Sequence, residues 1–504
     1  MKEKGRGEQQ ALILELERMV REGHSLLAYK KLRSLNPSEF EPGQVAVLAN
    51  LCRRLGHGDT SFRWLKPLVW QQIELGVTPE PKVLLEFVYH LATYGSLDEA
   101  HELLDWVDFD QYPQAHLAKI TILFKEWRYL DSVPHLQQYI RKMKNDQYQV
   151  AIGTINLAAC YVFLKMDKAE ETVSGLIRMC QENDYRVLLG NAYELLSQVS
   201  IAQGEYAQAL DLLSKAEEIL RGNQSSSLLF VEKWQSIVGL LREPNSAEAK
   251  TRFLAVRQKA AERKNWETIR SCDFYYSYAT QDLETSKKVY FGTPFIPYRK
   301  MVEQQLGADL FSDEKYLWIP QWDIPKVHKN LKTLSVTDLS YEGRSVPIKQ
   351  GQLLHNFLKG ICLDFYKPAS IGFFHHNLYP GEYFDVKSTT EKVVRLKKRL
   401  NKALEAEDIP LVVRSSDNQL ILKATAPIAI EVPREYCFRN RQTELANKVV
   451  DLFPNKNFTT SDVQGEFKVS ERTAQRLIQF GVEKGLFEQR GSGKKTRYQV
   501  KKAS

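Results

Sequence analysis

The stretch NAYELLSQVSIAQGEYAQALDLLSKAEEIL, residues 191–220, carries the pattern that decides the fold. Gly204 marks a turn in its middle, and Ala209, Leu213 and Ala216 recur on one face of the segment that follows. This spacing of apolar residues is typical of an amphipathic helix. The stretch therefore predicts two helices that pack against each other across a short turn.

The same helix–turn–helix pattern returns through the first half of the chain at intervals of about 33 to 38 residues. The predicted turns fall at Gly23, Gly58, Gly95, Trp127–Arg128, Met166 and Gly204. The second clearest copy is YGSLDEAHELL at 94–104, where Gly95, Leu97 and Ala100 take corresponding places. One helix pair cannot bury its apolar face alone, so stacked neighbours are expected to share a core and to form a concave groove.

These residues resemble the tetratricopeptide repeat, in which small residues let the first helix of one unit nest against the second. The resemblance covers about residues 10–285 and implies an all-helical solenoid over 1–285. It also implies that the groove docks a protein or peptide ligand, although no residue identifies that ligand.

Composition indicates an ordinary soluble globular protein, since 43% of the 504 residues are hydrophobic and 26% are charged. No apolar run is long enough to span a membrane, and no export signal opens the chain, so we expect a cytoplasmic protein without membrane contact. The six cysteines are scattered and no pair has metal-ligand spacing. They are expected to be free thiols in a reducing compartment.

The net charge of +8 is concentrated in two segments. Residues 441–504 hold 13 Lys/Arg against 7 Asp/Glu, and residues 387–402 hold 7 Lys/Arg against 1 Glu. Basic surfaces of this kind attract nucleic acid through its phosphates. The alternative is that each is a solvated charged face.

Residues 286–330 are predicted to form an ordered connector rich in proline and aromatic residues. Pro294, Pro297, Pro320 and Pro325 are expected to exclude regular helix from it.

Residues 331–430 are predicted to form a basic α+β module. A hairpin at 334–348 turns at Glu342-Gly343, helical segments follow at 351–366 and 371–378, and a second hairpin spans 411–424. Between them, Ser388 to Glu391 has the spacing of a capping box that opens a long helix. The basic side chains of that helix form a stripe: Lys392, Arg395, Lys398, Arg399 and Lys402.

This order of elements resembles the winged-helix output domain of response regulators of the OmpR type. The resemblance spans about 90 residues and starts at LSYEGRSV; it departs in the wing, which lacks the arginine-glycine-tyrosine tip. It implies DNA contact by the basic helix, with solvent or a protein partner as the alternatives. His375 and His376 are expected to hold no metal, because adjacent helical residues diverge and no third ligand lies nearby.

The segment GLFEQRGSGKKTRYQV, 485–500, raises the question of a nucleotide-phosphate loop. Such a loop needs glycine where Glu488 stands and Ser or Thr where Lys495 stands. A strand-like run, not a helix, follows. We therefore exclude a nucleotide site and expect no cofactor.

Upstream of that segment lie predicted helices at 441–453 and 459–468, then a third that begins with Ser470 as N-cap. Ala474, Leu477 and Ile478 are expected to face the core. Residues 490–495 are predicted to form the tip of a hairpin.

The pattern closely resembles a winged helix-turn-helix, with T-x-x-D-V, V-S-x-R-T-A-x-R, G-L-F and a glycine-basic wing that ends in R-Y. It assigns 438–504 to a C-terminal DNA-binding domain whose third helix enters the major groove. Carried over by position, the helix contacts are Arg472, Thr473, Gln475, Arg476 and Gln479. The wing contacts are Lys494, Lys495 and Arg497.

The predicted fold class is mainly α, a helical solenoid followed by two small α+β winged-helix domains. The predicted function is a non-enzymatic transcription regulator, since no catalytic or metal cluster stands at usable spacing. Its predicted partners are double-stranded DNA and a peptide or protein ligand, and a homodimer is equally allowed. The alternative is a scaffold whose winged helices make protein contacts.

Overall fold

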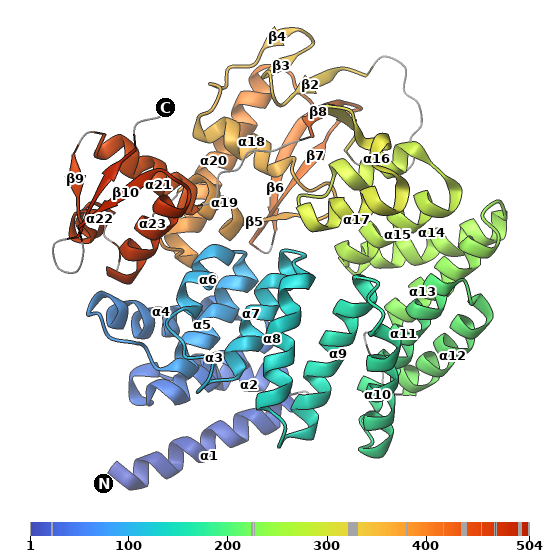
Figure 1. Ribbon diagram of the computed structural model, residues 1–504, viewed down its shortest axis with the longest axis horizontal. Coiled ribbons are helices and arrows are strands. Elements are labelled where there is room, and N and C mark those ends of the chain that lie inside the picture. The colour runs from blue at the N-terminus through green and yellow to red at the C-terminus, as the bar shows by residue number, and fades with distance from the viewer. Residues whose placement is uncertain are drawn as a thin grey trace. The chain divides into compact units, whose positions relative to one another are not determined.

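The computed structural model describes residues 2–501 except 22–23, 223–224, 226, 321–330, 380–381, 417, 435–440, 455, 468, 470 and 492–495. Helices dominate this described part, and its strands all follow the helical first half (Figure 1). None of the helices it contains is both long and apolar enough to cross a bilayer. The chain divides into unit 1, Met1–Ala118, Ser370–Leu396 and Cys437–Ser504, and unit 2, Lys119–Ala369 and Lys397–Tyr436.

Unit 1 opens with successive helices that pack on one another. They are α1 (Lys2–Arg21), α2 (Ser25–Ser34), η1 (Pro37–Glu39), α3 (Pro42–Arg54), α4 (Gly58–Glu74), α5 (Pro81–Tyr94), α6 (Leu97–Leu104) and the start of α7 (Gln114–Lys125). Its later elements are α19 (Ile371–Leu378), the first half of α20 (Val386–Ala406), α21 (Arg441–Leu452), β9 (Asn457–Phe458), α22 (Thr460–Phe467), α23 (Glu471–Glu483), β10 (Phe487–Arg490) and β11 (Arg497–Val500).

Unit 2 continues the helical pairs and then turns to mixed structure. Its helices are α8 (Tyr129–Lys142), α9 (Gln147–Phe163), α10 (Ala169–Glu182), α11 (Arg186–Gln203), α12 (Tyr206–Gly222), α13 (Leu228–Arg242), α14 (Ala247–Glu262), α15 (Trp266–Thr280), α16 (Leu283–Phe291), α17 (Ile296–Leu306), η2 (Ala308–Phe311) and α18 (Leu353–Ile361). Its strands are β1 (Lys315–Trp318), β2 (Thr333–Ser335), β3 (Ser340–Tyr341), β4 (Arg344–Ser345), β5 (Ala369–Ser370), β6 (Leu411–Ser416), β7 (Gln419–Ala424) and β8 (Ala429–Pro433).

The stretch 191–220 forms α11 and α12, which lie side by side as predicted (Figure 1). Gly204 ends α11 in the left-handed conformation, and Ala209, Leu213 and Ala216 are fully buried in a core that α13 shares. The predicted fold class, a helical solenoid followed by small α+β segments, is confirmed.

The other predicted turns match the helix ends with small shifts. Left-handed residues stand at Gly95, Trp127 and Lys165, at or next to the predicted positions. Gly58 is instead the first residue of α4, and the left-handed residue of that turn is Gly56. The predicted turn at Gly23 lies outside the described residues.

The prediction that prolines exclude helix from 286–330 was wrong. The end of α16 and all of α17 lie there, because Pro297 occupies the first turn of α17, where no intrahelical N–H bond is needed. Trp318 ends strand β1, as an ordered connector would require. Residues 321–330, with Trp322 and Pro325, lie outside the described residues.

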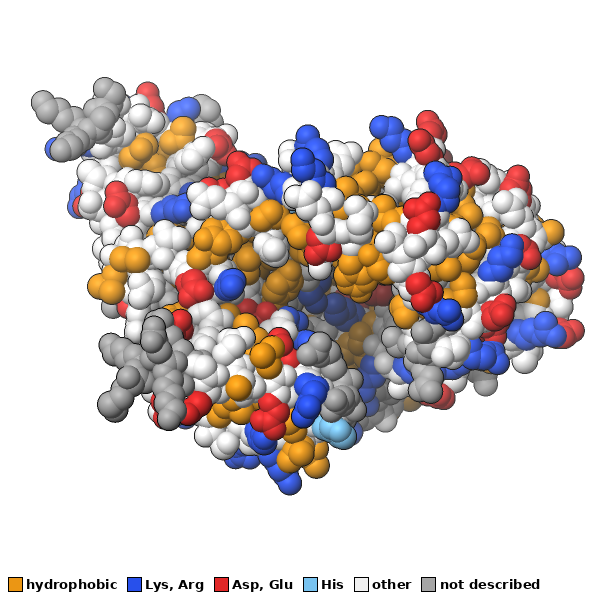
Figure 2. All heavy atoms as spheres, turned by 90° about the horizontal axis from the view of Figure 1, so that it is seen from below, with side chains coloured by type: hydrophobic (Ala, Val, Ile, Leu, Met, Phe, Trp, Pro, Cys, Tyr) orange, Lys and Arg blue, Asp and Glu red, His pale blue; other side chains and the backbone are white. Residues whose placement is uncertain are grey.

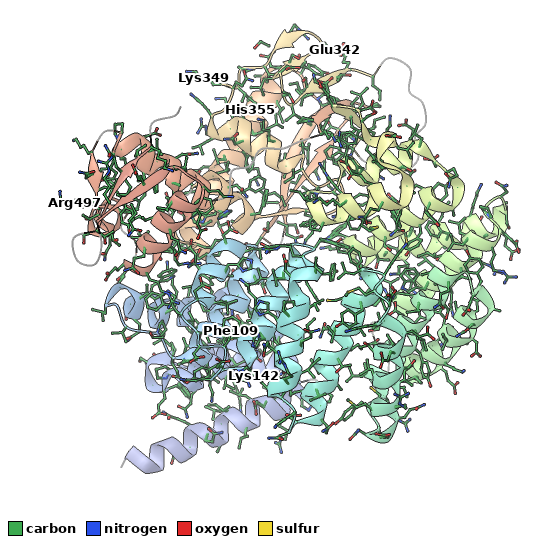
Figure 3. All side chains as sticks on the ribbon, in the orientation of Figure 1. Phe109, Lys142, Glu342, Lys349, His355 and Arg497 are labelled. Atoms are coloured by element: carbon green, nitrogen blue, oxygen red, sulfur yellow. The ribbon has the colours of Figure 1, made fainter. Side chains whose placement is uncertain are left out.

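The two hairpins predicted in 331–430 are present. Tyr341 pairs with Arg344 across a turn in which Glu342 and Gly343 are both left-handed, and Glu342 is labelled in Figure 3. These strands extend a five-stranded sheet of order β1-β8-β2-β3-β4. In the second hairpin β6 pairs with β7 as far as Ser416 and Gln419, and β5 pairs on the other side of β7.

The helix predicted at 351–366 is shorter, since α18 ends at Ile361. The Asp364 carboxylate accepts from the backbone N–H groups of Tyr366 and Lys367, a local turn that competes with helix. On α18 the buried His355 is neutral: its Nδ1 accepts from Gly351 N–H and its Nε2 donates to the Val336 carbonyl, both at 2.8 Å.

Unit 1 packs α19 against α5 and α6. A Cβ on Gly372 would lie 2.4 Å from the Tyr94 carbonyl oxygen, so the backbones meet at a distance that only glycine allows. Phe384 packs between the rings of Phe62 and Tyr94, and its N–H donates to the buried Glu99 carboxylate at 2.8 Å. The segment that leads into α20 is therefore part of the core of unit 1.

Unit 2 buries charged side chains that the sequence patterns did not predict. Arg257 Nε donates to Asp273 Oδ1 at 2.6 Å, and Lys288 Nζ lies 3.1 Å from Asp273 Oδ2. Burial would raise the pKa of Asp273, but Lys288 and Arg257 outweigh it and hold this pKa below its ordinary value. Arg270, fully buried on α15, donates to Asp364 Oδ2 at 2.8 Å.

The cysteines agree with the prediction of free thiols where the structure describes them. Cys52, Cys160, Cys180, Cys272 and Cys362 are buried, and no disulfide joins any two of them. Burial raises the pKa of Cys52 to about 12, so this thiol is held neutral. Cys437 lies outside the described residues.

Candidate nucleic-acid interface

The C-terminal module, residues 441–501, folds as three helices and a small sheet. The sheet has the order β10-β11-β9; β9 was not predicted, because two residues are too short a pattern to detect. The core joins one face of α23 to α21 and the sheet through Leu445, Val449, Leu477 and Ile478. Gly481 is needed here, since a Cβ would lie 2.0 Å from the Phe487 ring.

The outward face of α23 gathers the residues that the sequence singled out. Arg472, Gln475 and Gln479 are exposed, and Thr473 and Arg476 are half-buried. Ala474, Leu477 and Ile478 are buried on the opposite side, as expected. The proposed helix contacts thus lie on one polar surface. Ser470, the predicted N-cap, lies outside the described residues.

The predicted hairpin is present and follows this helix along the chain. Arg490 pairs with Arg497 at the ends of β10 and β11, and Gly491 is left-handed at the start of the turn. Arg497 is exposed on β11, and Figure 3 labels it on this module. The predicted wing contacts Lys494 and Lys495 lie outside the described residues.

Two arginines of α23 contact the end of α6, a feature that no sequence signal indicated. Arg476 forms an ion pair with Asp105, and its Nη1 lies 3.5 Å from the Glu102 carbonyl oxygen. The Arg472 guanidinium lies 5.3 Å from the ring centroid of Trp106. The partners are 374 residues apart for Arg476 and Glu102, beyond the reach of any local pattern.

A cavity of about 930 Å³ borders these contacts. Its walls include Trp70 and Leu75 of the α4 end, Trp106, and Arg472 and Gln475 of α23. Leu75 is 74% exposed. The contact between α23 and the other helices of unit 1 is therefore incompletely packed.

The long basic helix α20 begins earlier than predicted. Its N-cap is Asp385, whose carboxylate accepts from the N–H groups of Lys387 and Ser388. The capping box predicted at Ser388 to Glu391 was wrong, because the helix already begins at Val386 and Ser388 lies inside its first turn. The reciprocal bond comes from Thr389, whose hydroxyl accepts from the Asp385 N–H.

Of the five basic residues of the α20 stripe, one forms an ion pair and four are exposed. Lys392 forms an ion pair with Glu382 and lies 5.3 Å from the Tyr379 ring centroid. The exposed cations are Arg395, Lys398, Arg399 and Lys402. On the face of the molecule drawn in Figure 2, acidic, basic and hydrophobic side chains are intermixed.

The adjacent histidines have separate partners. His376 Nε2 lies 2.6 Å from Asp98 Oδ2, and His375 Nε2 lies 3.6 Å from Glu382 Oε2. Within the described part of the chain, no group of three or more His, Cys, Asp and Glu has a geometry that could hold a metal ion.

No protein-family model and no curated protein matches this chain. Among solved structures, it is similar to a Rap protein complexed with competence and sporulation factor, with a TM-score of 0.41, 12% identity, and coverage of 60% of this chain and 89% of that one. It is also similar to the apo form of RapI, with a TM-score of 0.36, 13% identity, and coverage of 61% and 94%. At such low scores, neither likeness assigns a ligand or partner to this chain.

Proposed function

We propose that this chain is a non-enzymatic regulator that binds duplex DNA through its C-terminal module and a protein or peptide partner through its helical repeats. The observation that carries the DNA part is the outward face of α23. Arg472, Gln475 and Gln479 project from a helix whose other face is fixed in a hydrophobic core. A rigid helix with a polar, basic face is what major-groove reading requires.

Each side chain of this polar surface has a defined role in the proposal. Arg472 and Arg476 pair with guanine edges, and Gln475 pairs with an adenine edge. Arg497, on the strand that follows the hairpin, contacts phosphate. Thr473 and Gln479 border the same surface.

The exposed cations of α20 add a second, sequence-independent contact. Arg395, Lys398, Arg399 and Lys402 present four positive charges along one helix, which suits a phosphate backbone better than a base edge. Lys392 belongs to the same stripe, but its ion pair with Glu382 has to open before it can contact a phosphate.

A second candidate function is an adaptor whose C-terminal modules bind protein. Two observations favour it: α19 is packed on α5 and α6, and Arg476 is already paired with Asp105. Both place residues of the predicted DNA-binding modules in protein contacts.

Titration of labelled duplex with the full chain at low and high salt separates the two functions. The proposed regulator binds duplex at low salt and loses affinity steeply as salt rises, since phosphate contacts release counterions. An adaptor would leave the duplex unbound at every salt concentration.

A further inference from the structure

The two arginines proposed to read guanine are the same two that contact the segment Glu102–Trp106 at the end of α6. Asp105 offers Arg476 a carboxylate, and the Glu102 carbonyl oxygen lies near the same guanidinium. Trp106 offers Arg472 the face of an aromatic ring. A carboxylate and a carbonyl oxygen present acceptors to an arginine fork much as the O6 and N7 atoms of guanine do.

A guanidinium held by Asp105 cannot at the same time make a bidentate pair with a base. The groove edge and the segment Glu102–Trp106 therefore compete for one surface of α23. The competition is direct, because it involves the same side-chain atoms and needs no change inside the C-terminal module.

The contact is weak enough to be reversible. The Arg476 and Asp105 side chains are 29% and 38% exposed, and a cavity of about 930 Å³ borders the contact in place of a packed core. A partly exposed ion pair and an exposed cation–π contact each shift an equilibrium by about two- to fivefold.

We propose that the segment Glu102–Trp106 is an internal competitor that occupies the reading face of α23 until DNA or a repeat-bound partner displaces it. This inference rests on the proposed function, since it assigns a regulation to the same surface. The fraction of molecules with α23 free sets the apparent affinity for DNA, so loosening the contact strengthens binding.

The test compares the full chain with Asp105→Asn, Trp106→Leu and the double variant on one labelled random duplex. Asp105 lies just after the last turn of α6, where asparagine keeps the size of the side chain, and Trp106→Leu leaves the net charge unchanged. Each single variant should bind about two- to fivefold more tightly than the wild type, and the double variant more tightly still. The gain from Asp105→Asn should shrink as salt screens the ion pair.

Glu8→Gln is the matched control, because it removes one exposed carboxylate from α1 without touching α23. It should bind as the wild type does. If the wild type binds duplex and neither variant binds more tightly than Glu8→Gln, the competitor is overturned and the proposed function stands. If neither wild type nor variants bind duplex at low salt, the proposed function fails and the inference fails with it.

Discussion

Arginine has opposite uses in α14–α15 and in α23. Arg257 and Arg270 are buried and their charges are matched by Asp273 and Asp364, so they hold unit 2 together. Arg472 and Arg476 lie on the surface of α23, and their contacts with Trp106 and Asp105 are partly exposed. Burial therefore separates an arginine that stabilises the fold from one that is available for a ligand.

The largest expected effect is on the stability of unit 2, where the buried arginines lie. Arg270→Ala leaves the Asp364 carboxylate without its partner in the interior, and breaking a buried pair in this way costs about 3–5 kcal/mol. We expect a clear fall in the midpoint of thermal unfolding followed by circular dichroism. Arg252→Ala, on the exposed side of α14, is the control and should melt like the wild type. Equal melting midpoints for Arg270→Ala and Arg252→Ala would show that the buried arginine does not stabilise the fold more than an exposed one does.

On the α23 side the expected effect is on recognition. Arg476→Ala should reduce discrimination between a selected duplex and a random one by about 1–3 kcal/mol, the value of a bidentate base contact. Random DNA should bind as before or slightly more tightly, because the substitution also removes the ion pair with Asp105. The melting curve should be unchanged.

Arg497→Ala is the matched control for this experiment, since it lies on β11 and is assigned to phosphate. This variant should bind the selected and the random duplex more weakly than the wild type, by the same factor for each. A parallel loss of affinity for both duplexes with Arg476→Ala as well would show that α23 does not read bases.

Sequence periodicity predicted the helical pairs and both faces of α23, because these depend on spacings within one helix. Ala209 and Leu213, or Leu477 and Ile478, are buried as their spacing requires. The distinction between Arg270 and Arg476 could not be predicted in this way. The partner of Arg270 is 94 residues distant and that of Arg476 is more distant still, and burial depends on such long-range packing.

Local competition explains the errors at helix boundaries. The N-cap of α20 is Asp385 and not the predicted Ser388, because the Asp385 carboxylate accepts from backbone N–H groups there. Helix α18 ends before the predicted position 366, where the Asp364 carboxylate accepts from the Tyr366 N–H in a local turn. In both cases an Asp carboxylate accepts hydrogen bonds from nearby backbone N–H groups. Several short polar residues near each boundary could do the same, so the sequence alone does not show which of them sets the helix end. The boundaries predicted at 285, 330 and 430 remain predictions.

The basic stripe of α20 offers a graded test of phosphate binding. Replacement of Arg395, Lys398, Arg399 and Lys402 with glutamine should flatten the log–log salt dependence by about 0.9 for each phosphate that is no longer neutralised. Lys392→Gln is the comparison and should change the slope less than the loss of any one of the other four cations, because Glu382 has to release Lys392 first. An unchanged slope for the fourfold variant would assign this face to solvent or protein.

The smallest expected effect is on the pH dependence of stability, through the buried His355. Burial lowers the pKa of His355, with Lys359 adding to this and the bond to Val336 opposing it, so the folded state binds its proton less readily than the unfolded chain does. Stability from this residue is complete above the unfolded pKa of about 6.5 and declines as pH falls below it. His355→Gln should reduce the acid dependence of the melting midpoint, and the exposed His24→Gln should not.

The most direct test of the central claim is selection of duplexes from a random pool by the full chain at low salt, followed by sequencing of the retained fragments. The outward face of α23 predicts a shared motif with the wild type, and its loss with the Gln475→Ala/Arg476→Ala variant while DNA is still retained. Failure of the wild type to retain any duplex, or recovery of the same motif with the variant, would contradict the claim.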